Sequence, residues 1–341
     1  MRCYKKKRRF LLPLVALGVM LSACYAATSD TYEISTLEAK TTPTINAARE
    51  TRESTAILQN STKNGDTMPE SPENTDTFDP NFYIFLCFGQ SNMEGAAPIE
   101  PQDRTVDARF QVLQSLDCPN LGRSKNTWYP AVPPLTQCYS GLSPADYFGR
   151  TMVTNLPENI RVGVINVAVG GCDIRLFDKD LYQDYDDTYK EAWFMDKIKA
   201  YGGNPYQHLI NLAKLAQRRG VIKGILLHQG ETNTGDRQWP HYVHKIYNDI
   251  LADLSLDAAS VPLLAGEVVE AEQGGCCASM NSIIATLPDT IPTAHVISSH
   301  GCTAQDNAHF DSAGVRELGR RYAEKMLSLM GYTIGPTEIT P

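Results

Sequence analysis

The chain has 341 residues, of which 42% are hydrophobic, so it is long enough to bury a substantial core. Its formal net charge is −8, and the first 23 residues carry six basic and no acidic side chains, so the remainder is more acidic than the whole. An acidic body of this kind disfavours nucleic acid and anionic membrane surfaces as partners, and it is compatible with a neutral substrate.

The chain begins with a segment typical of a secretory signal peptide. A basic cluster precedes an apolar run over 10–23 that is too short to span a bilayer. The run ends in LSAC, which resembles the lipobox of bacterial lipoproteins, and this resemblance implies cleavage before Cys24 and lipidation of its thiol. An ordinary signal peptide cleaved near Ala23 or Ala27 is the alternative. We therefore expect residues 1–23 to be removed and the protein to be exported and lipid-anchored at the bacterial cell envelope, periplasmic or surface-exposed.

Residues 24–78 are predicted to form a disordered tether. Thr, Ser, Glu, Asn and Asp dominate this stretch, so it cannot bury enough apolar surface to offset the entropy of the chain. A helix over 45–58 is the alternative, but no partner face for it is evident. The domain plan is completed by a folded body over 79–332 and a C-terminal tail over 333–341.

From residue 79 the chain alternates predicted strands and helices. Strands are predicted at 82–88, 162–169, 221–228, 261–269 and 293–299. Helices are predicted at 142–156, 205–220, 239–256, 279–288 and 312–331. Two long excursions, over 96–140 and 172–203, interrupt this alternation. The pattern predicts an α/β fold in which a parallel sheet of about five strands is covered by helices on both faces.

Seven cysteines lie beyond Cys24, and an exported protein permits disulfides. Cys118 and Cys138 flank a Pro-rich loop and are the first predicted pair. The second predicted pair joins Cys302 to one of two adjacent cysteines, Cys276 or Cys277. Because seven is an odd number, at least one thiol stays free unless it is bridged to another molecule.

The string GQSNMEG at 89–95 follows the first predicted strand and contains a candidate nucleophile. Ser91 comes just after the strand, and Gly89 and Gly95 give the backbone freedom around it. A turn from strand to helix exposes the hydroxyl and directs backbone N–H groups towards an incoming carbonyl oxygen. The string is not Gly-x-Ser-x-Gly, so it does not match the nucleophile elbow of α/β-hydrolases. A lone serine here is more often a helix cap, and the complete string is what favours a functional role.

A serine hydroxyl needs a neighbouring base, and the chain offers seven histidines. His309 is the preferred candidate because Asp306 lies three residues before it, in a turn that precedes a predicted helix. There the carboxylate can hold the imidazole tautomer and stabilise the imidazolium as it forms. A capping aspartate beside a surface histidine is the alternative. No metal site is predicted, because His241 and His244 are expected on a helix surface and no Cys-x-x-Cys occurs.

Two further segments supply donors for an oxyanion. NVAVGG at 166–171 ends the second predicted strand, and no side chain shields the N–H of Gly171. HQGETN at 228–233 ends the third, and the amide of Asn233 and the N–H of Ser91 are further donors. Taken singly, NVAVGG is more often a simple tight turn, and HQGETN is more often a polar strand end. Because the carboxyl ends of parallel strands share one edge of a sheet, we expect these groups to converge.

Together, the GQSN, glycine, GETN and DNAH segments resemble the four blocks of SGNH hydrolases. More narrowly, GQSNMEG with HQGETN is similar to the carbohydrate-esterase branch that includes sialate O-acetylesterase-like and acetylxylan esterases. The likeness covers roughly 80–331. It implies a flavodoxin-like three-layer α/β/α sandwich, no metal or other cofactor, and the removal of O-acetyl groups from a carbohydrate.

Carried over by position, the resemblance implies a role for each residue of these blocks. Ser91 is the nucleophile, His309 the base and Asp306 its orienting acid. Gly171 and Asn233 complete an oxyanion hole with the Ser91 N–H.

The resemblance leaves the acid open, because Glu231 is an alternative or additional partner for the base. Gln90 and Asn92 are expected to hold the serine loop in shape, and His228 and Gln229 to support the site from behind.

The expected partner is an acetylated carbohydrate, with acetylxylan-like polysaccharide as the first interpretation. Sialate or peptidoglycan O-acetyl groups are the alternative, and a glycan-binding lipoprotein with an inactive site is an alternative of another class. Substrate choice is expected to lie in the excursions over 96–140 and 172–203. Trp128, Tyr129, Trp239 and the Tyr-rich loop over 182–189 are candidates for stacking on sugar rings, with ordinary loop packing as an equal alternative.

Overall fold

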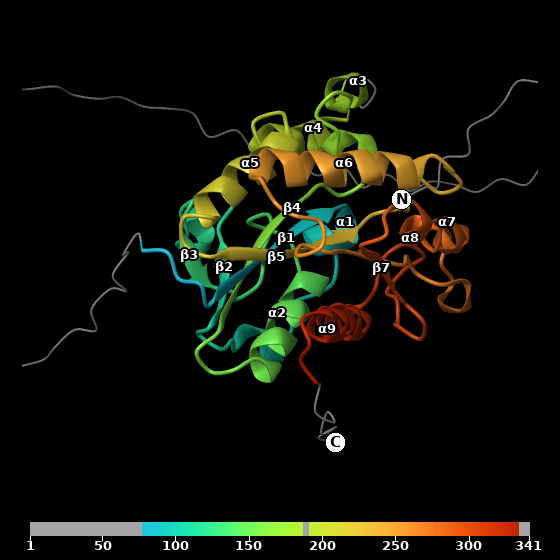
Figure 1. Ribbon diagram of the computed structural model, residues 1–341. Helices are drawn as coiled ribbons and strands as arrows, with labels where there is room; N and C mark the ends of the chain where they lie inside the picture. The colour runs from blue at the N-terminus through green and yellow to red at the C-terminus, as the bar shows by residue number, and fades with distance from the viewer. Residues whose placement is uncertain (1–76, 187–190, 334–341) are drawn as a thin grey trace, which may run out of the picture. The chain divides into compact units, whose positions relative to one another are not determined.

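The computed structural model describes residues 77–186 and 191–333, which form a sheet between two layers of helices (Figure 1). The predicted signal peptide, Cys24 and nearly all of the predicted tether lie outside the described residues, as do residues 334–341 of the predicted tail. Within the described ranges, no helix has both the length and the apolar character needed to cross a lipid bilayer.

The sheet has seven strands in the order β3-β2-β4-β1-β5-β6-β7. The strands are β1 (Phe82–Gly89), β2 (Phe110–Leu113), β3 (Trp128–Pro130), β4 (Arg161–Ala168), β5 (Val221–His228), β6 (Leu263–Gly266) and β7 (Ala294–Ile297). Only β3 is antiparallel to its neighbour among these strands. All five strands expected from the sequence are present, and their order β4-β1-β5-β6-β7 is the flavodoxin-like one.

The expected count of about five strands is wrong, because β2 and β3 extend the sheet at one edge. Both arise inside the excursion over 96–140, which the sequence indicated to be loop. They have four and three residues, so they are too short to show a period-2 pattern. Pro130 ends the edge strand β3, a position where the missing N–H of a proline is tolerated.

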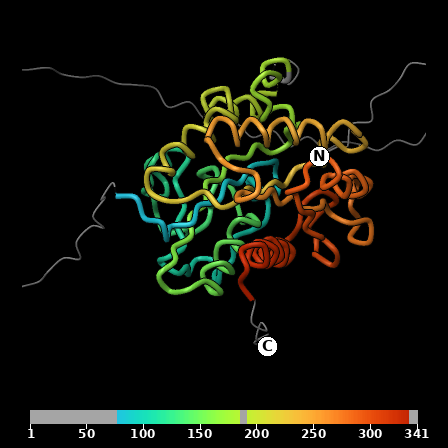
Figure 2. Tube along the Cα trace, viewed as in Figure 1, coloured from blue at the N-terminus to red at the C-terminus, as the bar shows by residue number. Residues whose placement is uncertain are grey.

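The helices cover both faces of the sheet, as the alternating pattern predicted (Figures 1 and 2). One face carries α2 (Pro144–Asn155) and α9 (Ser312–Leu329), which lie side by side. The other carries α4 (Ala192–Ala200), α5 (Pro205–Ala216) and α6 (Trp239–Leu254). Shorter helices are α1 (Ser91–Glu94), α3 (Tyr182–Asp186), α7 (Asn281–Ile284) and α8 (Leu287–Thr290).

The single helix predicted over 279–288 is wrong. The chain instead forms a 3₁₀ turn over Ala278–Met280, then α7 and α8. Pro288 is the reason for the break, since a proline is accommodated in the first turn of a helix but not in its interior.

Alternate side chains of β1 enter two separate hydrophobic clusters, because successive side chains of a strand point to opposite faces. Ile84 and Leu86 lie in the cluster that contains α5 and α6. Phe85 and Cys87 lie in the cluster that contains α2 and α9. A strand buried on both faces has a continuous apolar sequence, and this is why the run over 82–88 predicted a central strand.

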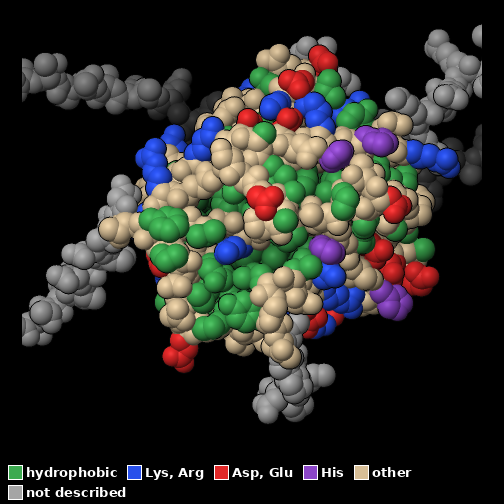
Figure 3. Space-filling model, in the orientation of Figure 1, with side chains coloured by type: hydrophobic (Ala, Val, Ile, Leu, Met, Phe, Trp, Pro, Cys, Tyr) green, Lys and Arg blue, Asp and Glu red, His purple; other side chains and the backbone are tan. Residues whose placement is uncertain are grey.

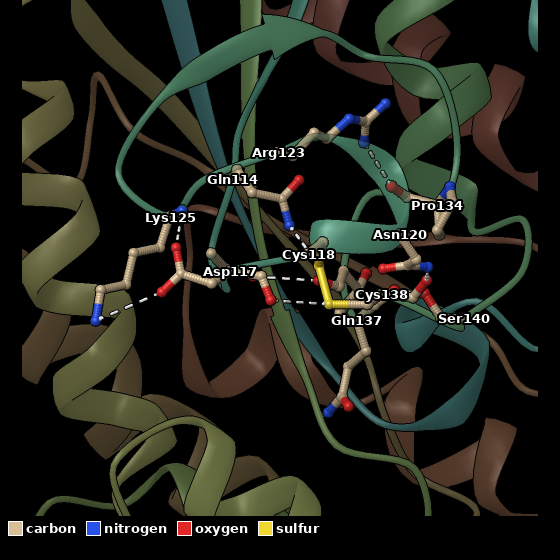
Figure 4. Close-up of a disulfide and its surroundings, with 12 residues drawn as sticks. Gln114, Asp117, Cys118, Asn120, Arg123, Lys125, Pro134, Gln137, Cys138 and Ser140 are labelled. Atoms are coloured by element: carbon tan, nitrogen blue, oxygen red, sulfur yellow. Dashed lines mark hydrogen bonds and ion pairs between the residues drawn. A yellow bond between two sulfur atoms is a disulfide. The ribbon is translucent and has the colours of Figure 1, made fainter. Parts of the chain in front are cut away.

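The predicted disulfide between Cys118 and Cys138 is confirmed, with a Cα–Cα distance of 5.2 Å (Figure 4). The second predicted pairing is wrong, because Cys302 is a buried free thiol. The Sγ atoms of Cys276 and Cys277 instead lie 2.9 Å from each other.

On the face shown in Figure 3, hydrophobic side chains gather at the centre and to its left, and acidic and basic side chains lie both around and within this area. The two signs of charge are therefore interspersed on this face, although the chain as a whole is acidic.

Candidate active site

Three neighbouring strands end at the same level of the sheet. Gly89, the last residue of β1, is paired with Ala168 on β4 and with His228 on β5. The segments that follow leave the sheet side by side at its carboxyl edge, next to the point where the strand order reverses. This is where open α/β sheets bind their ligands.

The turn after β1 depends on a glycine. Gly89 has φ of +150°, and a Cβ placed there would lie 2.1 Å from the carbonyl oxygen of His228. Only a residue without a side chain lets β1 and β5 approach so closely. The turn leads directly into α1, whose first residue is Ser91, and this serine is only 8% exposed.

Ser91, His309 and Asp306 form a continuous hydrogen-bonded chain. The Oγ of Ser91 lies 2.8 Å from Nε2 of His309. The other ring nitrogen, Nδ1, lies 2.8 Å and 3.0 Å from the two carboxylate oxygens of Asp306. The arrangement matches a hydroxyl, a base able to remove its proton and a carboxylate able to fix the tautomer of the base.

The turn over 306–309 is held by the same carboxylate. Asp306 Oδ1 accepts hydrogen bonds from the backbone N–H groups of Ala308 and His309, each at 2.8 Å. Partial burial raises the pKa of Asp306, but hydrogen bonds from the His309 ring and from the two backbone N–H groups outweigh it and lower the pKa below its ordinary value. The carboxylate is therefore ionised at neutral pH, where it can stabilise a protonated imidazole.

Glu231 occupies a different place. Its Oε1 accepts a hydrogen bond of 2.7 Å from Nδ2 of Asn92, and its side chain is only 6% exposed. Burial raises the pKa of Glu231 above its ordinary value despite this hydrogen bond. Of the two carboxylates that the sequence left open, the structure places Asp306 on the imidazole of His309 and Glu231 on the amide of Asn92.

Asn92 joins the serine turn to the histidine turn. Its Nδ2 donates to Glu231 and also to the carbonyl oxygen of Ala308, at 3.0 Å. Its Oδ1 accepts from the N–H of Phe310, at 3.2 Å. Three hydrogen bonds from one fully buried amide thus fix the distance between Ser91 and His309.

The other two expected oxyanion donors, the N–H of Gly171 and the side-chain amide of Asn233, also lie at this edge. Gly171 has φ of +83°, a left-handed conformation that favours glycine. Asn233 is buried, and its Oδ1 accepts from Gln229 Nε2 at 2.6 Å and from the N–H of Ile174 at 2.9 Å. Its Nδ2 has no hydrogen-bond acceptor at bonding distance within the described ranges, although it faces Asp173 and helps to lower the pKa of that group. A buried amide donor in this state is available to a ligand oxygen.

Gln90 and Gln229 connect the serine turn to the segment after β5. Gln229 Nε2 donates to Gln90 Oε1 at 3.1 Å, and the N–H of Thr232 donates to the same oxygen at 3.3 Å. The indole of Trp239 donates to Gln229 Oε1 at 2.5 Å. Because Trp239 is fully buried in this network, the interpretation of this residue as a sugar-stacking ring is wrong.

His228 lies beneath the site, with no exposed surface. Its Nδ1 is 3.4 Å from the hydroxyl of Tyr322, and burial lowers its pKa from the ordinary value of 6.5 to about 3. The ring is therefore neutral at physiological pH and packs as part of the support for Glu231 and Tyr322.

Two residues at the site were missed by the sequence analysis. The Oε2 of Glu94 accepts hydrogen bonds from the N–H of Gly170 at 3.2 Å and from Nζ of Lys197 at 2.6 Å. Glu94 lies within the GQSNMEG string, so the sequence could have indicated that it belongs to the site. Lys197 lies in the excursion over 172–203 and carries no such signal.

One cluster of metal-ligating side chains is found among the described residues, formed by Asp178, Asp180 and Asp249. The ammonium of Lys245 lies between them, at 2.8, 2.7 and 2.9 Å from their oxygens. The ammonium of Lys245 thus occupies the position between the three carboxylates that a cation would take.

Comparison with known proteins gives a family and a fold. A family model described as carbohydrate esterase, sialic acid-specific acetylesterase, matches residues 81–328. A protein from Arabidopsis thaliana aligns with a TM-score of 0.56 at 18% identity, over 73% of this chain and 99% of that one. NanS aligns with a TM-score of 0.55 at 15% identity, over 74% and 99%. A carbohydrate acetylesterase from Xanthomonas citri aligns with a TM-score of 0.52 at 17% identity, over 74% and 57%. These structures confirm the predicted α/β architecture.

Proposed function

The chain belongs to the carbohydrate esterase family of sialic acid-specific acetylesterases, which are carboxylic ester hydrolases, and we propose that it removes O-acetyl groups through Ser91. The observation that carries this proposal is the contact of 2.8 Å between Ser91 Oγ and His309 Nε2, completed by Asp306 on the far side of the ring.

The first half of the reaction forms an acetyl-enzyme. His309 Nε2 takes the proton of Ser91 as Oγ attacks the acetyl carbonyl carbon, and Asp306 stabilises the imidazolium. The carbonyl oxygen becomes an oxyanion, which accepts from the N–H groups of Ser91 and Gly171 and from Nδ2 of Asn233. That buried Nδ2 makes no hydrogen bond of standard geometry to another described residue, which supports its assignment as a donor.

The second half releases acetate. The bond from the carbonyl carbon to the sugar oxygen breaks, and the proton held by His309 passes to that oxygen. Water then attacks the acetyl group on Ser91, with His309 as base, and the serine regains its proton. Activity should fall at acidic pH, because a protonated imidazole cannot accept the proton of the serine.

Replacement of Ser91 by Ala tests the proposal. We expect turnover of 4-nitrophenyl acetate to fall by about 10⁶-fold, the loss seen when the nucleophile of a triad is removed. Ser140→Ala is the matched control, since among the described residues that hydroxyl donates to the carbonyl of Gln137 and to no group of the triad. Brief mixing of wild type with substrate, followed by acid quench and mass spectrometry, should show one acetyl group on the peptide that contains Ser91. Full turnover by Ser91→Ala would contradict the mechanism and would favour the glycan-binding alternative if wild type were inactive too.

The identity of the acetylated carbohydrate is a separate part of the proposal. The description of the family supports O-acetylated sialic acid, and the resemblance of GQSNMEG and HQGETN extends to esterases of acetylated xylan. Acetate release from acetylated sialoglycan, xylan and peptidoglycan, measured in parallel, decides among the three. The carbohydrate with the highest kcat/KM is the natural class.

A cavity of about 600 Å³ between the two excursions supports the placement of substrate selection there. One wall comes from the segment after β2, with Asp117 and Lys125, and from the disulfide-linked Cys138 (Figure 4). The other wall is the end of α4, including Lys199. Since β2 is parallel to β4, the segment after β2 leaves the sheet at its carboxyl edge, as the turn with Ser91 does, although the lining includes no residue of the triad.

We propose that the protein acts at the cell envelope, with Cys24 as its lipid anchor. The support is the order of basic cluster, short apolar run and LSAC in the sequence. Cys24→Ser should move the protein from the membrane fraction to the soluble fraction without loss of specific activity. Membrane retention of this variant would contradict the anchor.

A further inference from the structure

A carboxylate and an ammonium lie directly against the backbone turn that carries one of the proposed oxyanion donors. A Cβ placed on Gly170 would be 2.6 Å from Glu94 Oε2, 3.2 Å from Lys197 Nζ and 3.5 Å from Ser91 Cβ. These three groups therefore surround the peptide that precedes Gly171, and any side chain at position 170 would displace them.

Glu94 links the serine helix to this turn. It is the last residue of α1, three positions after Ser91, and it is 7% exposed. Its Oε2 accepts from the N–H of Gly170. The next N–H along the chain, that of Gly171, is the oxyanion donor in the proposed mechanism. The carboxylate thus sets the orientation of the peptide plane next to the donor that the mechanism uses.

The helix α4 holds the same turn from the other side. Lys197 Nζ is bound to Glu94 Oε2 at 2.6 Å, with its side chain 29% exposed. One turn further on, the hydroxyl of Tyr201 donates to the carbonyl oxygen of Ala168 at 3.3 Å. The exit of β4 is therefore fixed at two points by a helix that belongs to the excursion over 172–203.

We propose that Glu94 is a positioning residue of the esterase site, which holds the Gly170–Gly171 turn in its oxyanion-binding orientation with Lys197 on α4 as its counter-ion. This inference rests on the proposed function, because it assigns a role within the same site. It also explains why a lysine from a distant excursion reaches a carboxylate beside Ser91.

The ionisation of Glu94 connects this geometry to pH. Burial raises its pKa, whereas the ion pair and hydrogen bond from Lys197 and the N–H of Gly170 lower it. The other titratable groups that interact with it are His309, Tyr201 and Cys172. Removal of Lys197 takes away an interaction that lowers the pKa of Glu94, while burial continues to raise it. The carboxyl group of Glu94 therefore protonates at a higher pH. A neutral carboxyl group is a weaker acceptor for the N–H of Gly170.

The test compares Lys197→Met with Lys214→Met. Lys214 is an exposed lysine on α5 that does not line the cavity described above. We expect Lys197→Met to move the part of the acidic limb of the kcat profile that reports Glu94, a fall of about tenfold, about 1 to 3 pH units upward, as for a carboxyl group that loses an adjacent cation. KM should change little, because the turn acts on the transition state. Lys214→Met should leave the limb unchanged.

Two further variants show whether the lysine acts through Glu94. Glu94→Gln should lower kcat about tenfold over the whole pH range, less than the loss of a complete oxyanion donor. Glu94→Gln with Lys197→Met should no longer show the shifted limb, because no carboxyl group remains to titrate. A shifted limb in the double variant would overturn the inference, as would an unshifted limb in Lys197→Met.

Failure of this inference is distinguishable from failure of the proposed function. If Ser91→Ala is inactive while Glu94→Gln keeps the kcat of wild type at every pH, only the positioning role is overturned. If Ser91→Ala keeps its turnover, the proposed function itself is wrong. Thermal unfolding shows whether each variant is folded. In the Glu94 and Lys197 variants, labelling of Ser91 by a fluorophosphonate shows that the nucleophile is accessible, so a drop in kcat reports on the turn.

Discussion

Two regions meet at Ser91, and they support it by different physical means. The turn over 306–309 lies near the surface, where the side chain of Asp306 is 51% exposed and that of His309 14%. In the segment over 228–233, three side chains are buried: His228 is 0%, Gln229 1% and Asn233 3% exposed. The group that must carry charge is thus kept within reach of water, whereas the groups that fix the shape of the site are kept away from it.

The two carboxylates make the contrast explicit. The pKa of Asp306 is lowered, because hydrogen bonds from His309 and the backbone outweigh its partial burial. The pKa of Glu231 is raised, because its burial outweighs the hydrogen bond from Asn92. One carboxyl group is suited to stabilise an adjacent cation, and the other to accept a hydrogen bond within a closed network.

The largest effect that separates the two regions is expected from Asp306→Asn. An amide in this position favours the wrong tautomer of His309 and gives no negative charge to the imidazolium, so kcat should fall by about 10³- to 10⁴-fold. Steady-state kinetics on 4-nitrophenyl acetate measures the loss, and KM should stay near the value of wild type.

Asp311→Asn is the matched control for that variant. Asp311 lies two positions after His309 and caps α9 by accepting from the N–H of Gly314, a role that asparagine also performs well. Its replacement should leave kcat within about twofold. An equal fall in both variants would mean that the local fold of the turn, and not the charge of Asp306, limits activity.

Glu231→Gln should have a much smaller effect. Glutamine keeps an acceptor for Nδ2 of Asn92, so the variant loses only the difference between a charge-assisted and a neutral hydrogen bond, about 1 kcal/mol. We expect kcat to fall by less than about tenfold and His309 to keep its partner. A fall as large as that of Asp306→Asn would identify Glu231 as the acid that serves His309.

The elements that sequence could predict are those with a local pattern. The apolar run of β1 and the strand-end polar segments predicted the sheet and the meeting of Ser91 with His309, since parallel strands end at one edge. The choice between Asp306 and Glu231 could not be made, because it depends on how far each side chain extends across the fold. Lys197 escaped prediction for a related reason: a lysine on an amphipathic helix is usually solvated, and only the contact with Glu94 distinguishes it.

The last effect concerns the buried side, and it is seen in the pH dependence of stability and not in activity. The folded-state pKa of His228 is about 3, below the ordinary value of 6.5, because burial disfavours the imidazolium. Between these two values the unfolded chain binds a proton that the folded chain excludes. The contribution of His228 to stability is therefore present above about pH 6.5 and declines as pH falls, by about 1.4 kcal/mol per pH unit.

His228→Gln should remove this dependence. Urea unfolding at about pH 7 and about pH 5 should show that wild type loses more stability than the variant over this interval, by about 2 kcal/mol. His241→Gln, at an exposed position of α6, is the control and should follow wild type. Parallel curves for wild type and His228→Gln would mean that the folded protein also binds the proton. Glu231, whose Oε1 lies 3.9 Å from Nε2 of His228, would then be its counter-ion, and the segment over 228–233 would carry charge as the turn over 306–309 does.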